Sequence, residues 1–268
     1  MRLSCLNAMV GDRPLNEVFD VVRDAGFDGI DFRGDFAAEN LEAIGALAAS
    51  TGIPVATIYG RITIPLLSAG IADRLASVDM VRQRLRTAAA VGAENVIVVP
   101  VFGEPRITAD PGHGVVATEI AVMFTLLAEL ADDAAEAGVR IVLEPLNRRE
   151  THLLTSPTTT AELTRRLGSP CVRTMLDTYH TDLEGQDAAQ ELNAGGDQIA
   201  LIHLSDRERR LPGDGGIDFS PLLAQGFGGW MGLECGAVYD REQLTQCVDW
   251  LRAGAPAGLE TSSQSSLS

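Results

Sequence analysis

The chain has 268 residues, of which 46% are hydrophobic and 22% charged, a balance typical of a globular protein with one large core. Its formal net charge of −16 gives a surface that repels phosphate backbones and anionic lipids, so we expect neither nucleic acid nor a membrane as a partner. No apolar run approaches the roughly 20 residues that span a bilayer, and the first ten residues lack the pattern of a signal peptide. These features predict a cytoplasmic location.

Eight short apolar runs, several of them rich in Val and Ile, recur along the chain and predict β-strands. They occupy residues 3–6, 29–32, 55–59, 95–101, 140–145, 172–177, 200–204 and 232–235. Nearly continuous apolar strands are typical of a parallel sheet covered on both faces. Residues 15–22, 120–127 and 244–251 have apolar positions at helical spacing, which predicts amphipathic helices that pack against that sheet.

Strands alternating with helices in a chain of this length predict a single (β/α)₈ TIM barrel. No shift in composition divides the chain, so the barrel domain is expected to fill residues 1–259, and the Ser-rich residues 260–268 to form a disordered tail. The connections 102–114 and 205–217 are longer than the ~2–6 residues of an ordinary βα loop, and we expect them to hold substrate. The four cysteines show no paired spacing and are expected to be reduced thiols.

Four of the predicted strands end in a residue of a type that binds metal ions, namely Glu144, Asp177, His203 and Glu234. The carboxyl ends of the strands of a closed barrel meet at one mouth, so these side chains are expected to converge there. Three carboxylates and one imidazole at one point would repel each other and lose solvation, and a divalent cation relieves both problems. Oxygen ligands with one imidazole favour Mn²⁺, with Mg²⁺ or Co²⁺ as alternatives.

The second half of the chain resembles the xylose isomerase-like superfamily of TIM-barrel sugar isomerases and epimerases. Within it, the likeness is to ketose 3-epimerases (D-tagatose and D-psicose 3-epimerases) and to hydroxypyruvate isomerases. The motifs that carry the resemblance are EPLNRRE at 144–150, LDTYH at 176–180, IHLSDRERRLPGDGGIDF at 202–219 and GLECG at 232–236. The resemblance implies metal binding by Glu144, Asp177, His203 and Glu234, and substrate binding by Glu150, His180 and Arg209.

The resemblance also implies a reaction. One divalent cation binds two neighbouring oxygens of a keto sugar and acidifies the adjacent C–H bond. Glu144 and Glu234, themselves ligands, act as the acid/base pair: one removes a proton to give a cis-enediolate, and the other returns a proton to the opposite face. The expected result is inversion at C3 of a ketose. The substrate is then a small sugar or keto acid, and analogy alone predicts a homo-oligomer.

Other outcomes stay open at this point. Return of the proton to the other carbon would make the protein an aldose–ketose isomerase of the hydroxypyruvate type, and loss of water would make it a keto-inositol dehydratase. An endonuclease IV-like nuclease needs a histidine-rich site with several metals, whereas this chain has four histidines. A non-catalytic binding protein is disfavoured because all four ligand types are present.

Loops after the first four strands are expected to set the substrate specificity. Arg33, Tyr59, Arg61 and Phe102 are the candidates there. Two further histidines, His113 and His152, have no partner in the sequence and are expected to lie on the surface.

Overall fold

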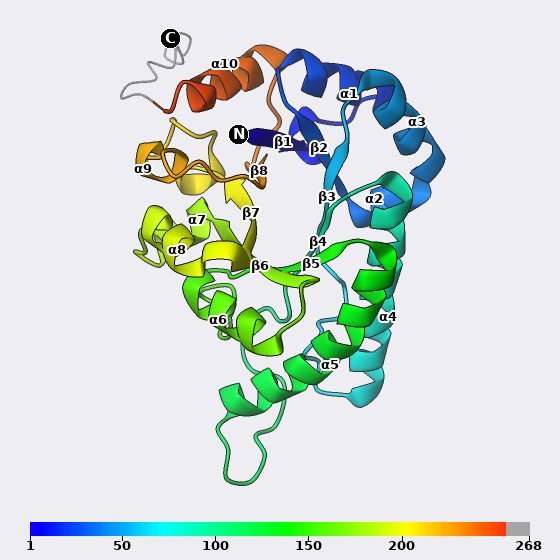
Figure 1. Cartoon of the computed structure of the whole chain (residues 1–268), viewed down its shortest axis with the longest axis vertical. Helices are drawn as coiled ribbons and strands as arrows, with labels where there is room; N and C mark the ends of the chain where they lie inside the picture. The colour runs from blue at the N-terminus through cyan, green and yellow to red at the C-terminus, as the bar shows by residue number, and fades with distance from the viewer. Residues whose placement is uncertain (256–268) are drawn as a thin grey trace, which may run out of the picture.

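The computed structural model describes residues 1–255, and its eight parallel strands close into a barrel in sequence order (Figure 1). The strands are β1 (Arg2–Leu6), β2 (Gly29–Arg33), β3 (Val55–Tyr59), β4 (Asn95–Val98), β5 (Arg140–Leu143), β6 (Val172–Asp177), β7 (Ile199–Leu204) and β8 (Trp230–Leu233). Because β8 pairs with β1, the sheet has no free edge. The predicted TIM barrel is confirmed. The predicted domain end at residue 259 and the predicted disordered tail 260–268 lie outside the described residues.

Helices surround the strands on the outside of the barrel (Figure 1). They are α1 (Leu15–Asp24), α2 (Gly34–Glu39), α3 (Leu41–Thr51), α4 (Ile71–Val91), α5 (Val115–Ala137), α6 (Pro157–Leu167), α7 (Thr178–Leu183), α8 (Ala188–Gly195), α9 (Ser220–Leu223) and α10 (Arg241–Arg252). The three helices predicted from amphipathic spacing are α1, α5 and α10. Within residues 1–255, none of the helices has the length and apolar character needed to cross a membrane.

Alternate residues of each strand face opposite sides of the barrel wall, and this alternation builds two cores. The larger core lies between the strands and the helices. All four cysteines are free thiols, as predicted. The smaller core fills the barrel interior with one residue from each of six neighbouring strands: Ala56, Ile97, Val142, Met175, Leu201 and Trp230. Two positions further toward the carboxyl end lie Glu144 after β5, Asp177 on β6 and His203 on β7, so the packed interior forms the floor of the mouth.

Two strands end earlier than predicted, and proline explains both ends. β4 stops at Val98 rather than at residue 101, and β5 stops at Leu143 rather than at residue 145. Pro100 and Pro145 lack the N–H group that a strand ladder needs, so neither can continue the pairing. The last strand also lies two residues earlier than predicted, at Trp230–Leu233.

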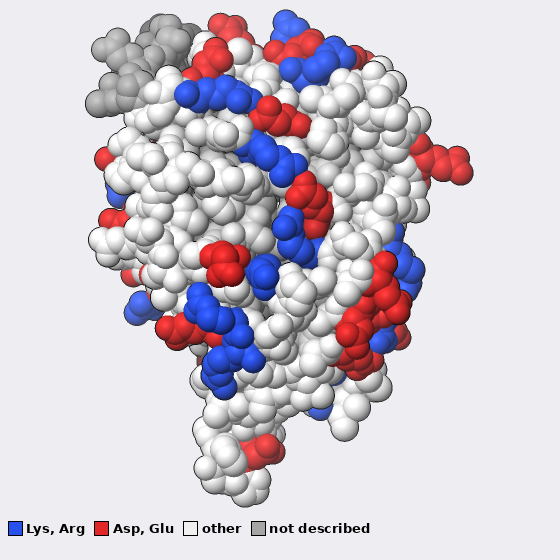
Figure 2. Space-filling view, in the orientation of Figure 1, with Lys and Arg blue, Asp and Glu red and all other residues white. Residues whose placement is uncertain are grey.

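Acidic and basic side chains are interspersed on the face shown in Figure 2, although the chain as a whole carries a formal charge of −16. Many charged side chains of the described residues form ion pairs; Arg82, for example, contacts Asp79 at 3.1 Å and Asp133 at 2.8 Å. The excess negative charge is therefore not gathered into one block on this face.

Candidate metal centre and active site

The four residues that end the predicted strands converge at the mouth of the barrel. Glu144, Asp177, His203 and Glu234 each offer one ligand atom, and these atoms all lie within 4.8 Å of one another. Asp177 closes β6 and His203 lies in β7, whereas the two glutamates directly follow β5 and β8. The convergence that the sequence predicted is therefore present in the structure.

Main-chain hydrogen bonds fix the two glutamates although neither lies inside a strand. The N–H of Glu144 donates to the carbonyl of Val98 at 3.1 Å, and the N–H of Glu234 donates to the carbonyl of Leu204 at 3.1 Å. Each bond continues the ladder to the neighbouring strand by one residue. Both side chains consequently follow the strand alternation and face the barrel interior.

Arg209 and His203 partly balance the negative charge of this group. One guanidinium nitrogen of Arg209, Nη1, donates to Asp177 Oδ2 at 2.7 Å and to Glu234 Oε2 at 2.9 Å. Nδ1 of His203 lies 3.0 Å from Glu234 Oε2, and the second oxygen of Asp177 accepts the N–H of Tyr179 at 2.8 Å. Three carboxyl groups thus face one guanidinium and one imidazole.

The two glutamates have opposite environments. Burial, with repulsion from Glu234, raises the pKa of Glu144 to about 8, and no donor among the described residues bonds its carboxyl group. Burial also opposes the charge on Glu234, but His203 and Arg209 hold the pKa of Glu234 well below its ordinary value. Burial disfavours the imidazolium of His203, yet the neighbouring Glu234 raises its pKa to about 9.

These residues fit a divalent cation. Nε2 of His203 is a buried nitrogen without a hydrogen-bond partner among the described residues, and the Glu144 side chain, which lines the pocket, has no donor among them. Three carboxyl groups and one imidazole are a ligand set that Mn²⁺, Mg²⁺ or Co²⁺ accepts. A cation would supply the positive charge that Glu144 lacks, and this group could therefore hold one ion.

The raised pKa of Glu144 makes the stability of the protein in a chelator depend on pH. The folded protein keeps this proton up to a pKa of about 8, whereas the unfolded chain releases it near 4.5. Because the folded state then binds more protons, stability from this group falls as pH rises through that window. We expect Glu144→Gln to be increasingly more stable than the wild type between about pH 5 and about pH 8, as measured by urea unfolding with chelator. Parallel stability curves for the two proteins would contradict this.

The three predicted substrate-binding residues lie beside the metal-ligand group and contact one another. His180 lies 2.9 Å from Arg209 through its Nε2 and 2.8 Å from the Asn147 side chain through its Nδ1. The same Asn147 amide donates to Glu150 at 2.7 Å. Burial lowers the pKa of His180, and the nearby Arg209 charge acts in the same direction against the pull of Asp177. Sequence reasoning missed Asn147, which ties Glu150 to His180; its position inside the EPLNRRE motif was the available signal.

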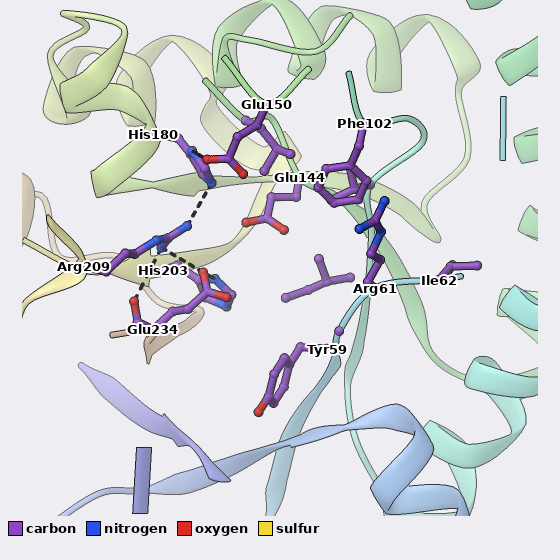
Figure 3. A pocket seen from close by; sticks show the side chains of 14 residues that line it. Tyr59, Arg61, Ile62, Phe102, Glu144, Glu150, His180, His203, Arg209 and Glu234 are labelled. Carbon is purple, nitrogen blue, oxygen red and sulfur yellow. Dashed lines mark hydrogen bonds and ion pairs between the residues drawn. The ribbon is translucent and has the colours of Figure 1, made fainter. Parts of the chain in front are cut away.

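One pocket with a volume of about 170 Å³ opens onto this site. Six of the seven predicted site residues line it: Glu144, Glu150, His180, His203, Arg209 and Glu234. Asp177 is buried behind them. Tyr59, Arg61 and Phe102 form the opposite wall (Figure 3), where the Arg61 guanidinium stacks on the Phe102 ring at 4.7 Å. Arg33 does not line the pocket and pairs with Asp35 instead.

A buried aspartate organises the loop that presents Arg209. Asp206 accepts the N–H groups of Arg207 and Ile217 on one oxygen and that of Gly213 on the other, at 2.8 to 3.0 Å. A side chain at Gly215 would place its Cβ 2.5 Å from the Asp206 carboxylate. Arg209 itself adopts a left-handed backbone with φ of 56°, a strained conformation that these bonds maintain. The glycine-rich loop therefore folds around Asp206.

Asp206→Ala is expected to lower stability and weaken substrate binding together. It leaves three buried or partly buried N–H groups without their acceptor, which costs roughly 1–3 kcal/mol. Loosening of the loop misplaces Arg209, so we expect KM to rise more than kcat falls. Urea unfolding and steady-state kinetics measure both effects, with Asp214→Ala as the control because Asp214 lies exposed in the same loop. Equal behaviour of the two variants would show that Asp206 does not position the loop.

The expectation that His152 lies free on the surface is wrong, whereas His113 is exposed as predicted. His152 is partly buried: Nε2 contacts the carboxylate of Glu119 at 2.5 Å, and Nδ1 contacts the carbonyl of Gly103 at 2.7 Å. Gly103 in turn donates its N–H to the carbonyl of Glu150 at 2.7 Å. These contacts join the loop after β4, which carries Phe102, to the loop after β5, which carries Glu150.

A closed parallel barrel that gathers acidic and imidazole side chains, a possible metal-binding group, at the carboxyl ends of its strands has the architecture of barrel enzymes whose active sites lie at that end. The chain belongs to the xylose isomerase-like TIM barrel family, whose model matches residues 19–254. It is 26% identical over 240 residues to 3-dehydro-D-guloside 4-epimerase of Escherichia coli K12, covering 84% of this chain and 87% of that one. It is 33% identical over 95 residues to L-ribulose 3-epimerase of Methylomonas sp. DH-1, about a third of each chain. The isomerase class predicted from the sequence is confirmed by these relatives.

Solved structures share the fold. A 3-keto-D-glucoside 4-epimerase from E. coli, in its apo form, matches with a TM-score of 0.83 at 24% identity, covering 94% of this chain and 99% of that one. D-psicose 3-epimerase with D-tagatose from Clostridium cellulolyticum H10 matches with a TM-score of 0.82 at 17% identity, covering 95% and 99%. At these identities the likeness shows the fold of the barrel.

Proposed function

We propose that the protein is a divalent-metal-dependent sugar epimerase that inverts a carbon next to a keto group through an enediolate. One observation carries the proposal: four ligand-type atoms from consecutive strands lie within 4.8 Å of one another. Three of the four residues also line a pocket that can admit a small polar molecule. The substrates named for the relatives of this chain, a glycoside and ketoses, are of that size.

Glu144, Asp177, His203 and Glu234 would hold the cation. When bound, such a cation polarises the carbonyl of a keto sugar and offsets the negative charge of the enediolate. Mn²⁺ suits this ligand set, and Mg²⁺ and Co²⁺ are alternatives. Arg209 donates to Asp177 and Glu234, two of the residues that would hold the cation, and its guanidinium would offer donors to substrate oxygens.

Glu144 and Glu234 would act as the acid/base pair. They follow β5 and β8, which are not neighbouring strands, so they approach a bound sugar from different sides. One carboxylate removes the proton next to the carbonyl, and the other returns a proton to the opposite face. Because the reaction is reversible, either glutamate can begin. His180 and Glu150, which are linked through Asn147, would position the hydroxyl groups of the substrate.

In its specific form the proposal is epimerisation at C3 of a free ketose. A second form is epimerisation at C4 of a 3-keto glycoside. The similarity to 3-dehydro-D-guloside 4-epimerase supports this form, because that match extends over 84% of this chain. The ketose 3-epimerase matches extend over about a third of it. Both reactions invert the carbon next to a keto group, so the same residues serve either.

The test is a panel of ketoses and 3-keto glycosides, incubated with the protein and Mn²⁺ in deuterated water. Epimerisation places solvent deuterium on the inverted carbon and leaves the carbonyl where it was. An aldehyde product with deuterium at C1 or C2 would favour the isomerase instead, and loss of water would favour the dehydratase. Nicking of an abasic-site duplex would favour the nuclease. Among residues 1–255 a single metal-ligand group is found, which argues against a site of several metals.

A further inference from the structure

A fourth buried carboxyl group, besides the three of the metal-ligand group, lies inside the barrel. Asp31 belongs to β2, is fully buried, and projects into the barrel interior because its neighbours Ile30 and Phe32 pack in the outer core. Burial is the main influence on this group and raises the pKa of Asp31 to about 6. Asp31 is not one of the four grouped ligands, and nothing in the proposed reaction uses it. A buried carboxylate of this kind is costly unless another group interacts with it.

The two oxygens of Asp31 differ in their contacts. Oδ2 accepts the hydroxyl of Ser4 at 2.6 Å, whereas Oδ1 is buried and makes no hydrogen bond to the described residues, although the Thr57 hydroxyl opposite it on β3 acts to lower the pKa of this carboxyl group. His203 shows the same asymmetry: its Nδ1 faces Glu234 at 3.0 Å, and its Nε2 is buried without a partner. An acceptor and a nitrogen that can donate are thus both unsatisfied in the same interior layer.

Gly232 shows that the two groups are neighbours. A Cβ placed on this glycine would lie 2.9 Å from Oδ2 of Asp31, 3.2 Å from the Ser4 hydroxyl oxygen bonded to it, and 3.3 Å from Cδ2 of His203, the ring carbon bonded to Nε2. The carboxylate and this edge of the imidazole therefore flank one small volume, which the lack of a side chain at Gly232 keeps free. The two groups make no direct hydrogen bond, and a single water molecule can span such a gap.

We propose that Asp31 is a positioning residue for the metal centre: it accepts the Nε2–H of His203 through one buried water, and so orients Nδ1 as the ligand atom. A histidine can bind a metal through one nitrogen while it donates the proton of the other, and a carboxylate partner fixes both the tautomer and the ring orientation. This inference rests on the proposed function, because it assumes that His203 binds a cation.

The test variant is Asp31→Asn. If the amide oxygen keeps the Ser4 bond, the amide NH₂ faces His203 and favours protonation on Nδ1, which cannot then bind a metal. We expect the Kd for Mn²⁺, measured by calorimetry on the full chain, to rise roughly 10–100-fold. Ser4→Ala is the matched control: it removes the other contact of the same carboxylate and leaves Oδ1 in place, so its Kd should stay within about threefold of the wild type.

Two further measurements separate positioning from folding. The melting temperature in chelator should be preserved in Asp31→Asn, since the substitution removes a buried charge and retains the shape of the side chain. In the Mg²⁺-loaded wild type, NMR of ¹⁵N-labelled histidine should show a protected proton on Nε2 of His203, and Asp31→Asn should lose it. If Asp31→Asn bound Mn²⁺ with the Kd of the wild type, or if the Mg²⁺-loaded wild type carried the His203 proton on Nδ1, this inference would be overturned and the proposed function would stand. Failure of the wild type to bind any of these ions would overturn the proposed function as well.

Discussion

Replacing either Glu144 or Glu234 with glutamine is expected to reduce kcat by on the order of 10³-fold or more while the protein stays folded. Glutamine has nearly the same shape as glutamate but cannot accept a proton from carbon. Each residue lies at the mouth of the barrel, outside the packed interior formed by Trp230 and its neighbours, so the core is unchanged. Both substitutions also remove a ligand, and Mn²⁺ at high concentration should therefore be present in the assay.

The two variants should differ in a way that a purely structural defect would not produce. Because one carboxylate remains in each, each variant should still exchange the substrate hydrogen of one epimer with deuterated water without forming the other epimer. The two variants should act on opposite epimers. Glu104→Gln is the control, since Glu104 is exposed in the loop after β4 and belongs to no part of the site. Normal turnover by either site variant, or exchange of the same epimer by both, would contradict the pairing.

Removal of divalent ions is expected to abolish turnover, by on the order of a hundredfold or more, because several kcal/mol of charge stabilisation are lost. Added Mn²⁺ should restore turnover, and Mg²⁺ and Co²⁺ are the ions to test after it. His203→Ala removes the one imidazole of the ligand group, so its turnover should not return at the Mn²⁺ concentration that saturates the wild type. Circular dichroism of the chelated protein should confirm that the barrel persists. Full activity after dialysis against chelator would show that no exchangeable cation takes part.

Much of the fold and of the ligand group could be predicted from the sequence because both depend on local regularities. The apolar runs repeat at the length of one strand-plus-helix unit, and a closed barrel brings the ends of such units together whatever the loops do. Glu144, Asp177, His203 and Glu234 could be grouped on this ground alone. The carboxyl ends of β4 and β5 were predicted too far along the chain, because Pro100 and Pro145 end the strand pairing early.

Contacts between distant segments could not be predicted in the same way. The bond between His152 and Glu119 joins residues 33 positions apart through a loop whose path the sequence does not specify. The position of Arg209 depends on Asp206 and on a left-handed backbone, so the sequence indicated a substrate-binding residue but not its contacts with Asp177 and Glu234. Asp31 was missed because its proximity to His203 arises across the barrel interior, between β2 and β7.

One dication held by the four strand-end residues is the feature on which the proposed chemistry depends. Crystals grown with Mn²⁺ and measured at a wavelength where manganese scatters anomalously would locate the ion. We expect one anomalous peak per chain, within bonding distance of Glu144, Asp177, His203 and Glu234, with the Arg209 guanidinium displaced from at least one carboxylate. No peak among these four side chains, with Arg209 still bridging Asp177 and Glu234, would contradict the assignment of a metal centre at the barrel mouth.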